Sequence, residues 1–254
     1  LIDNNDFHNS VLCTENQVPN KIIEKLKSNK ISKIVITGMG TCYTAAVAIS
    51  GYMRDLLQNF YPSIVIEPHV ASDGSAFYLK NMMSDTLVIV IAQSGTTVDT
   101  NVYVQMAKER GASSIAIANK REGDVTFITD GTLYIGSGRD IEIAVPSTKT
   151  YTAQVALGYI LSLYFCCRSN KSGKQNKLIS RNLKYIQKIP DLINDTFYSL
   201  ESQQLDSIVK DISPKYNSWY MVYDESPNSV CAMEIRIKYS ESCYHSLPYL
   251  NIDE

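Results

Sequence analysis

The sequence lacks the features that mark membrane, secreted and nucleic-acid-binding proteins. No apolar run in its 254 residues reaches the ~20 residues needed to cross a bilayer. The first residues, Leu1–Asp6, have neither the basic nor the apolar region of a secretory signal. Lys and Arg (24) nearly balance Asp and Glu (26), and the basic residues form no stripe. We therefore expect a globular, cytoplasmic protein with neither a membrane nor a nucleic acid as partner.

The cysteines and histidines lack the spacing of a metal site. The 6 cysteines include no C-x-x-C pair, and the 3 histidines stand at no metal-ligand spacing from them. We interpret the cysteines as reduced thiols and expect no metal. Cys42 differs because it is predicted to lie in an accessible loop at the start of a helix, where thiols are reactive. A catalytic nucleophile needs a partner base, and the sequence indicates none.

Short apolar runs alternate with helical patterns through the first two thirds of the chain. In the segment 41–59, for example, Ala45, Ile49 and Met53 recur at helical spacing. Such alternation favours right-handed βαβ units, and it predicts a three-layer αβα sandwich around a parallel, flavodoxin-like sheet. The predicted strands are 33–37, 63–67, 86–92, 113–118 and 132–135, and the predicted helices are 19–28, 41–59, 98–110 and 150–165.

A change of composition follows this region. Residues 168–177 are polar, basic and free of aliphatic side chains, which is typical of a solvated linker rather than of a nucleic-acid contact. Helical patterns then cover 178–189 and 190–208. An apolar strand at 219–223 and a helix at about 228–244 predict the start of a second α/β unit.

Three polar turns are the most informative part of the sequence. Each follows or lies near an apolar run and precedes a helical one: 38–42, 92–97 and 145–149. The start of a helix presents unpaired N–H groups and the positive end of its dipole, so anions bind there. A single such turn is more often only a helix cap. Three turns at the carboxyl ends of parallel strands favour a phosphate site, because open α/β sheets bind ligands at that edge.

These turns carry a family resemblance. Ala92–Thr100 (AQSGTTVDT) is similar to the S-Q-S-G-E-T-x-D-T motif of the sugar isomerase (SIS) domain family, and Glu142–Thr152 (EIAVPSTKTYT) is similar to its E-I-G-V-A-S-T-K-x-[FY]-T. Within that family the chain most resembles the isomerase half of glutamine–fructose-6-phosphate aminotransferase, also called glucosamine-6-phosphate synthase. The resemblance covers about residues 33–168, and it implies the SIS fold.

The resemblance implies roles for particular residues. Cys42 stands where the family usually has serine, and Ala92 replaces the first serine of the middle motif, so two hydroxyl donors are absent. By resemblance, phosphate contacts fall to Thr41, Gln93, Ser94 and Thr97, sugar-hydroxyl contacts fall to Val145 and Ser147, and Gly40, Cys42 and Gly95 complete the predicted binding residues.

The helix predicted at 228–244 holds the candidate catalytic group. Glu234, Lys238 and Glu241 project from one helical face at i, i+4 and i+7. From spacing alone, a solvated row of ion pairs is the favoured interpretation. However, the segment 232–241 (AMEIRIKYSE) resembles the family's A-x-E-x-A-L-K-L-K-E, whose last glutamate moves a proton between C1 and C2 of the sugar. The resemblance therefore implies that Glu241 is the general base, with Lys238 helping to hold its charge and Glu234 as a supporting acceptor.

Two catalytic groups of the family have no counterpart in this sequence. They are the histidine of an H-G-P motif, to which His245 does not correspond, and a lysine near the family's C-terminus. The sequence also lacks an initiator methionine and a glutaminase domain. We expect either a piece of a longer protein or a protein that cannot complete the reaction alone. The predicted organisation is a lead-in segment and helix (1–32), a first SIS domain (33–168), a linker with connecting helices (169–216) and the truncated start of a second SIS domain (217–254).

The resemblance implies an aldose–ketose isomerase or aminotransferase that acts on fructose 6-phosphate or a related sugar phosphate. It implies no cofactor, a homodimer, and ammonia supplied by a separate glutaminase or taken up free. Two alternatives stay open: a non-catalytic phosphosugar-binding or regulatory protein, which Cys42 and Ala92 favour, and an SIS deaminase or deglycase that uses the same residues.

Overall fold

Five parallel strands form the centre of the first of two units in this computed structural model, which describes residues 13–136, 142, 145–169, 174–212, 220–224 and 228–252. The units are Leu1–Asn176 and Lys177–Glu254. In the first unit the strand order is β2-β1-β3-β4-β5. The strands are β1 (Lys33–Gly38), β2 (Val65–Val70), β3 (Thr86–Ala92), β4 (Ser113–Ala118) and β5 (Gly131–Tyr134).

Apolar composition explains why most of these strands were predicted accurately. β3 and β4 have the predicted bounds, and every residue in both is buried, as expected of parallel strands covered on two faces. β2 was predicted at 63–67, which is wrong by two residues at its start and three at its end. Pro68 and His69 are poor strand formers, but β2 is an edge strand, where proline is tolerated.

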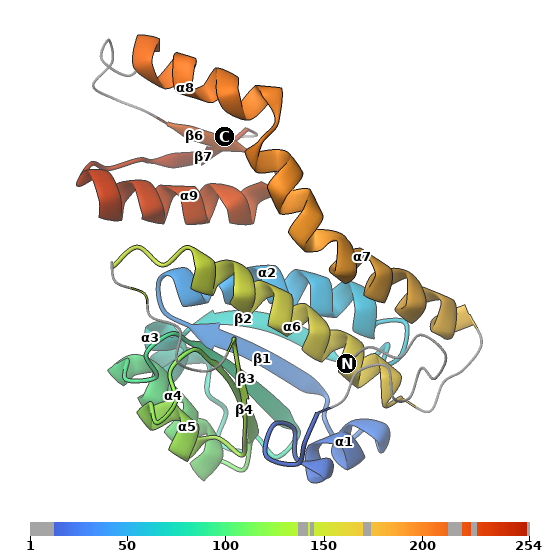
Figure 1. Cartoon of the computed structure of the whole chain (residues 1–254). Helices are drawn as coiled ribbons and strands as arrows, with labels where there is room; N and C mark the ends of the chain where they lie inside the picture. Colours follow the sequence, from blue (N-terminus) through green and yellow to red (C-terminus); the bar gives the residue numbers. More distant parts are fainter. Residues whose placement is uncertain are drawn as a thin grey trace. The chain divides into compact units, whose positions relative to one another are not determined.

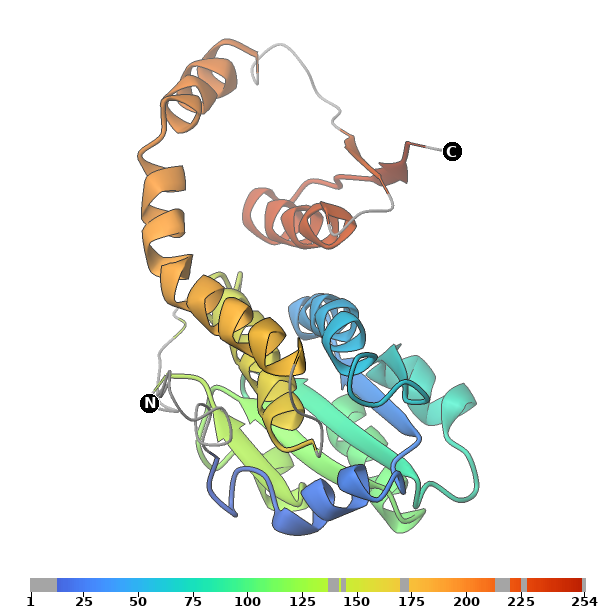
Figure 2. The ribbon, with the colours of Figure 1, turned by 90° about the vertical axis from the view of Figure 1, so that its right-hand side faces the viewer.

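Helices cover both faces of the sheet (Figures 1 and 2). On one face lie α2 (Thr41–Leu57) and α6 (Lys149–Cys167), and on the other lie α4 (Val98–Glu109) and α5 (Asp124–Ile128). The predicted three-layer αβα sandwich is thus confirmed. Helix α1 (Asn20–Lys27) contacts the amino end of β4, where Lys25 Nζ donates to Ser113 Oγ at 3.0 Å.

Alternation along the strands divides the core into two layers. Val35, Val88 and Val90 pack with Tyr103 and Val104 of α4. The intervening isoleucines of β1, β3 and β4 point to the opposite face, which α2 and α6 cover. There α2 and α6 approach closely, because a Cβ at Gly158 of α6 would lie 2.5 Å from Ile49 Cδ1 of α2.

Three short helical segments were not predicted. These are α3 (Ala71–Asp73), the π-helical turn η1 (Gly74–Tyr78) and α5. Each has five residues or fewer, which is too short for an amphipathic period to show in the sequence.

The second unit consists largely of helices with one small parallel sheet. Its elements are α7 (Lys174–Phe197, which begins in the last residues of the first unit), α8 (Leu200–Ile212), β6 (Met221–Tyr223), α9 (Asn228–Cys243) and β7 (Tyr249–Asn251). The predicted boundary between helices at Pro190 was wrong: α7 continues through this residue, since a proline removes one backbone donor without requiring a helix to end. β7 was not predicted, and it pairs with β6 in parallel.

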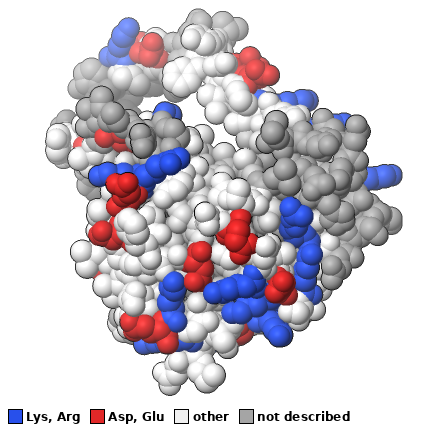
Figure 3. Space-filling model, turned by 60° about the horizontal axis from the view of Figure 1, so that its bottom comes forward, with Lys and Arg blue, Asp and Glu red and all other residues white. Residues whose placement is uncertain are grey.

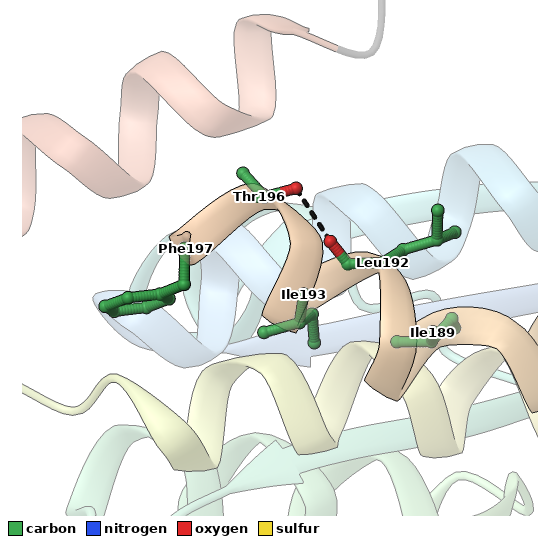
Figure 4. Close-up of a pocket in the computed structure, with 5 residues that line it drawn as sticks. All are labelled: Ile189, Leu192, Ile193, Thr196 and Phe197. Atoms are coloured by element: carbon green, nitrogen blue, oxygen red, sulfur yellow. Dashed lines mark hydrogen bonds between the residues drawn. The ribbon is translucent and has the colours of Figure 1, made fainter. Parts of the chain in front are cut away.

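One face of α7 carries a shallow pocket (Figure 4). It is lined by Ile189, Leu192, Ile193, Thr196 and Phe197, all from this one helix. Thr196 Oγ1 donates to the carbonyl of Leu192 at 2.7 Å. None of the five side chains is titratable or nucleophilic enough to suggest chemistry at this pocket.

Candidate functional site

The sheet has one topological switch point, between β1 and β3. These strands are parallel neighbours, but α2 leads from β1 to β2 on one side, whereas α4 leads from β3 to β4 on the other. Such a reversal opens a crevice at the carboxyl ends of the two strands, where α/β proteins bind ligands. The turns that follow β1 and β3 are the predicted turns 38–42 and 92–97. The structure thus brings these two turns together.

The first turn is a tight passage from β1 into α2. Gly40 has φ +54°, and Gly38 lies so close to Cys42 that a Cβ at Gly38 would be 2.8 Å from the Cys42 carbonyl carbon. Glycine is therefore required for this approach. Thr41 and Cys42, at the start of α2, are half-buried.

The second turn presents hydroxyl groups at the start of α4. Ser94 Oγ lies 2.9 Å from Thr96 Oγ1, and the backbone N–H of Thr96 donates to Ser94 Oγ at 3.3 Å. Gly95 has φ +74°. Thr96 and Thr97 are exposed, and Gln93 and Ser94 are half-buried. The turn therefore offers short side chains to a ligand, and hydroxyl donors suit a phosphate.

Contacts from other elements hold this second turn in place. The N–H of Lys120 donates to the Gln93 carbonyl at 3.1 Å, and the N–H of Val125 donates to the Gly95 carbonyl at 3.0 Å. Asn101 Nδ2 donates to the same Gly95 carbonyl at 3.3 Å. Two carbonyl groups of the turn are thereby engaged by the protein, which leaves the hydroxyl groups of the turn as the donors for a ligand.

The third turn leads into α6, and a carboxylate from the same chain caps it. Glu142 Oε1 accepts from the Thr150 N–H at 2.8 Å, from the Thr150 hydroxyl, and from Ser147 Oγ at 3.3 Å. Acidic groups are favoured at this end of a helix because they face the positive end of its dipole. Val145 is exposed, and Ser147 is half-buried beside the carboxylate.

A long-range contact joins α6 to the first turn. Gln154 Nε2 lies 3.6 Å from Cys42 Sγ, as a donor to the sulfur. Gln154 is only 1% exposed, and its Oε1 has no hydrogen-bond partner among the described residues. The helix that follows the third turn therefore lies against the start of α2, within reach of the crevice.

Sequence reasoning gave no role to Glu142 or Gln154. Glu142 was noted only as the first residue of a motif, and it lies seven positions before the start of α6, too far for a local capping signal. Gln154 stands 112 positions from Cys42, so no local signal could have indicated their contact.

In the second unit the predicted catalytic residues form one row on α9. Lys238 Nζ lies 2.9 Å from Glu241 Oε2 and 3.4 Å from Glu234 Oε1. The side chain of Glu234 is 10% exposed and that of Glu241 is 29% exposed. The row is therefore partly buried, and its central cation neutralises part of the charge of both carboxylates.

Burial affects several of the cysteine thiols. None of the 6 cysteines, all of which the structure describes, forms a disulfide. Burial raises the pKa of Cys13 and of Cys167 to about 11, so these thiols stay protonated at neutral pH.

Charge and hydropathy add little to this description of the site. Figure 3 shows basic and acidic side chains interspersed on the face it presents. Within the described ranges, no three His, Cys, Asp or Glu side chains gather as a metal site would require. No helix among the same residues is both long and apolar enough to cross a membrane.

Fold and site together define an α/β protein with a candidate ligand site at the switch point of a parallel sheet. The comparison with known families is specific: the SIS domain matches residues 26–164, more than half of the chain. The chain belongs to the SIS domain family.

Relatives within the family agree with this assignment. The chain is 38% identical to a glutamine–fructose-6-phosphate aminotransferase [isomerizing] of Clostridium tetani over 172 residues. This alignment covers 66% of the chain and 26% of the Clostridium protein. A protein of the same name from Caldanaerobacter subterraneus is 34% identical over 233 residues, covering 89% of the chain and 35% of that protein. The chain thus spans about a quarter to a third of these relatives.

A solved structure shares the fold. The C-terminal domain of glucosamine-fructose-6-phosphate aminotransferase from Francisella tularensis superposes with a TM-score of 0.73 at 19% identity, covering 98% of this chain and 67% of that one. At this identity the likeness supports the fold alone.

Proposed function

We propose that this chain is a phosphosugar isomerase of the glucosamine-6-phosphate synthase type, which acts on fructose 6-phosphate or a related sugar phosphate. The observation that carries the proposal is the pair of turns at the switch point, where hydroxyl groups and two helix starts converge. The names of the relatives point to the same substrate class. In the proposal Thr41, Gln93, Ser94 and Thr97 hold the phosphate, and Val145 and Ser147 contact sugar hydroxyls.

The proposed chemical step is proton transfer between C1 and C2 of the sugar. Glu241 is the proposed base because it is the more exposed of the two carboxylates in the α9 row, and it forms an ion pair with Lys238 Nζ, 2.9 Å away. Glu234 holds Lys238 from the other side. We further propose a cytoplasmic homodimer that uses no cofactor.

The test is deuterium exchange at C1 and C2 of fructose 6-phosphate, followed by NMR in D₂O with ammonia present. We expect the chain to incorporate the label and Glu241→Gln to lose incorporation by about 10²–10⁴-fold, the usual contribution of a general base. The matched control is Glu109→Gln, which neutralises an exposed carboxylate at the end of α4. Equal incorporation by both variants would remove Glu241 from the mechanism.

A non-catalytic phosphosugar-binding or regulatory protein is the alternative that a specific observation favours. The ion pairs of Lys238 with Glu234 and Glu241 are those of an ordinary charged helix face, and Cys42 and Ala92 remove two family hydroxyls from the binding turns. Saturable binding without any exchange would identify this function. Release of ammonia from glucosamine 6-phosphate would instead identify a deaminase.

A further inference from the structure

The third turn differs from the second in the kind of group it can accept. Both precede a helix, but the start of α6 already holds the carboxylate of Glu142, with three hydrogen bonds to its Oε1. An anionic ligand group at α6 would therefore meet a fixed negative charge where the Thr150 N–H would otherwise be available.

The neighbouring side chains present acceptors as well. Ser147 uses its proton on Glu142, which leaves its oxygen as an acceptor. Gln154 follows Thr150 by one turn on the same buried face of α6, and its Oε1 is buried without a partner. A buried amide oxygen without a donor costs ~1–3 kcal/mol, so a donor from a ligand would be stabilised there.

The contact between Gln154 Nε2 and Cys42 Sγ connects these acceptors to the crevice. At the switch point, Ser94 and Thr97 present donors to a ligand, whereas Glu142, Ser147 and Gln154 present acceptors along α6. The first unit therefore offers hydrogen-bond donors at one end of the candidate site and acceptors at the other.

We propose that Glu142 determines substrate specificity by excluding a second anionic group from the α6 end of the site. The inference rests on the proposed function, and it assigns Glu142 as the residue that discriminates between sugar monophosphates and bisphosphates. Sugar bisphosphates are rejected by charge repulsion.

The experiment compares the dissociation constants of fructose 6-phosphate and fructose 1,6-bisphosphate by calorimetry. Wild-type protein should prefer the monophosphate, and Glu142→Gln, which keeps the shape of the cap, should reduce this preference about tenfold, as expected for removing one charge near a phosphate. Glu142→Asp keeps the charge but shortens the cap, so the preference should remain. Glu24→Gln, an exposed carboxylate on α1, is the matched control and should leave the ratio unchanged.

Each outcome separates the inference from the proposed function. If Glu142→Gln weakens both ligands equally, or if the preference disappears in Glu142→Asp as well, the residue is only a helix cap and the inference is wrong. If wild-type protein binds no fructose 6-phosphate, the proposed function fails, and the inference fails with it. Should Glu142→Gln not fold, the wild-type preference must shrink as salt is raised, because repulsion between charges is screened; a salt-independent preference overturns the inference.

Discussion

The turn after β3 and the charged row on α9 hold their candidate residues in different ways. The turn at 93–97 is held by donors from two other segments: Asn101 in α4, and Lys120 and Val125 in the segment that follows β4. The row on α9 is linked by ion pairs between residues three and four apart on one helix. A site built by tertiary contacts is rigid before ligand arrives, whereas a row within one helix keeps side-chain freedom. The comparison suggests that binding is preorganised more firmly than the proposed proton transfer.

The largest effect should come from breaking the turn itself. Gly95→Ala should destabilise the protein by about 3 kcal/mol, because its φ of +74° is strained for alanine and a Cβ would lie 2.9 Å from Gly123 Cα. Gly51→Ala is the control, since nothing lies within 4 Å of a Cβ at this helical position. It should stabilise by about 0.5–1 kcal/mol. Urea unfolding measures both; equal effects would show that the turn is not constrained.

A smaller effect is expected when the turn keeps its shape but loses one donor. Ser94→Ala should weaken fructose 6-phosphate binding by about 1.5–3 kcal/mol, the value of a hydrogen bond to a charged group. The melting temperature should change little, since Ser94 Oγ bonds only within its own exposed turn in the described contacts. Unchanged affinity in calorimetry would exclude a phosphate contact at Ser94.

A polar cluster around His69 in the first unit should make the free energy of unfolding depend on pH. His69 Nδ1 lies 2.9 Å from Tyr103 Oη, its Nε2 lies 3.2 Å from Glu67 Oε2, and Glu67 pairs with Lys33 at 2.6 Å. Burial lowers the pKa of His69 below its usual 6.5. Below that pH the unfolded chain binds a proton that the folded chain does not, so stability falls as pH falls.

Glu67 acts in the same direction at lower pH. The hydrogen bond from Lys33 holds the Glu67 pKa below its usual 4.5, so the stability it contributes is also lost on acidification. His69→Gln should flatten the decline in unfolding free energy between about pH 7 and 5, whereas His245→Gln, at an exposed position, should not. An unchanged slope in His69→Gln would show that His69 does not carry the effect.

The smallest effect on stability should come from the row on α9. Glu241→Gln should cost no more than about 1 kcal/mol, because the Glu241 side chain is 29% exposed in its ion pair with Lys238. The same variant should lower isomerase activity more than stability if Glu241 is the base. A loss of stability comparable to that of Gly95→Ala would mean that the row is structural.

The sequence predicted the regular part of the fold well and the tertiary contacts of the site poorly. β3 and β4 were predicted to the residue because uniform burial makes them continuous apolar runs. The end of β2 was missed because Pro68 is a poor strand former and His69 serves a polar network that only the folded chain brings together. The turns at 38–42 and 92–97 were predicted to meet, since both follow parallel strands. The cap at Glu142 and the contact of Gln154 with Cys42 depend on how α6 packs, which no local pattern encodes.

The close approach of Gly158 to Ile49 has a mechanical consequence. Sliding α6 along α2 by one residue would bring a side chain against Ile49, where there is no room for even a Cβ. The close packing of Gly158 against Ile49 therefore fixes the position of α6 along its axis relative to α2. Gln154 precedes Gly158 by one turn of α6, so the same packing contact also fixes the distance between Gln154 and Cys42. A ligand that shifts the start of α6 along the helix axis would first have to displace the Ile49 side chain from its contact with Gly158.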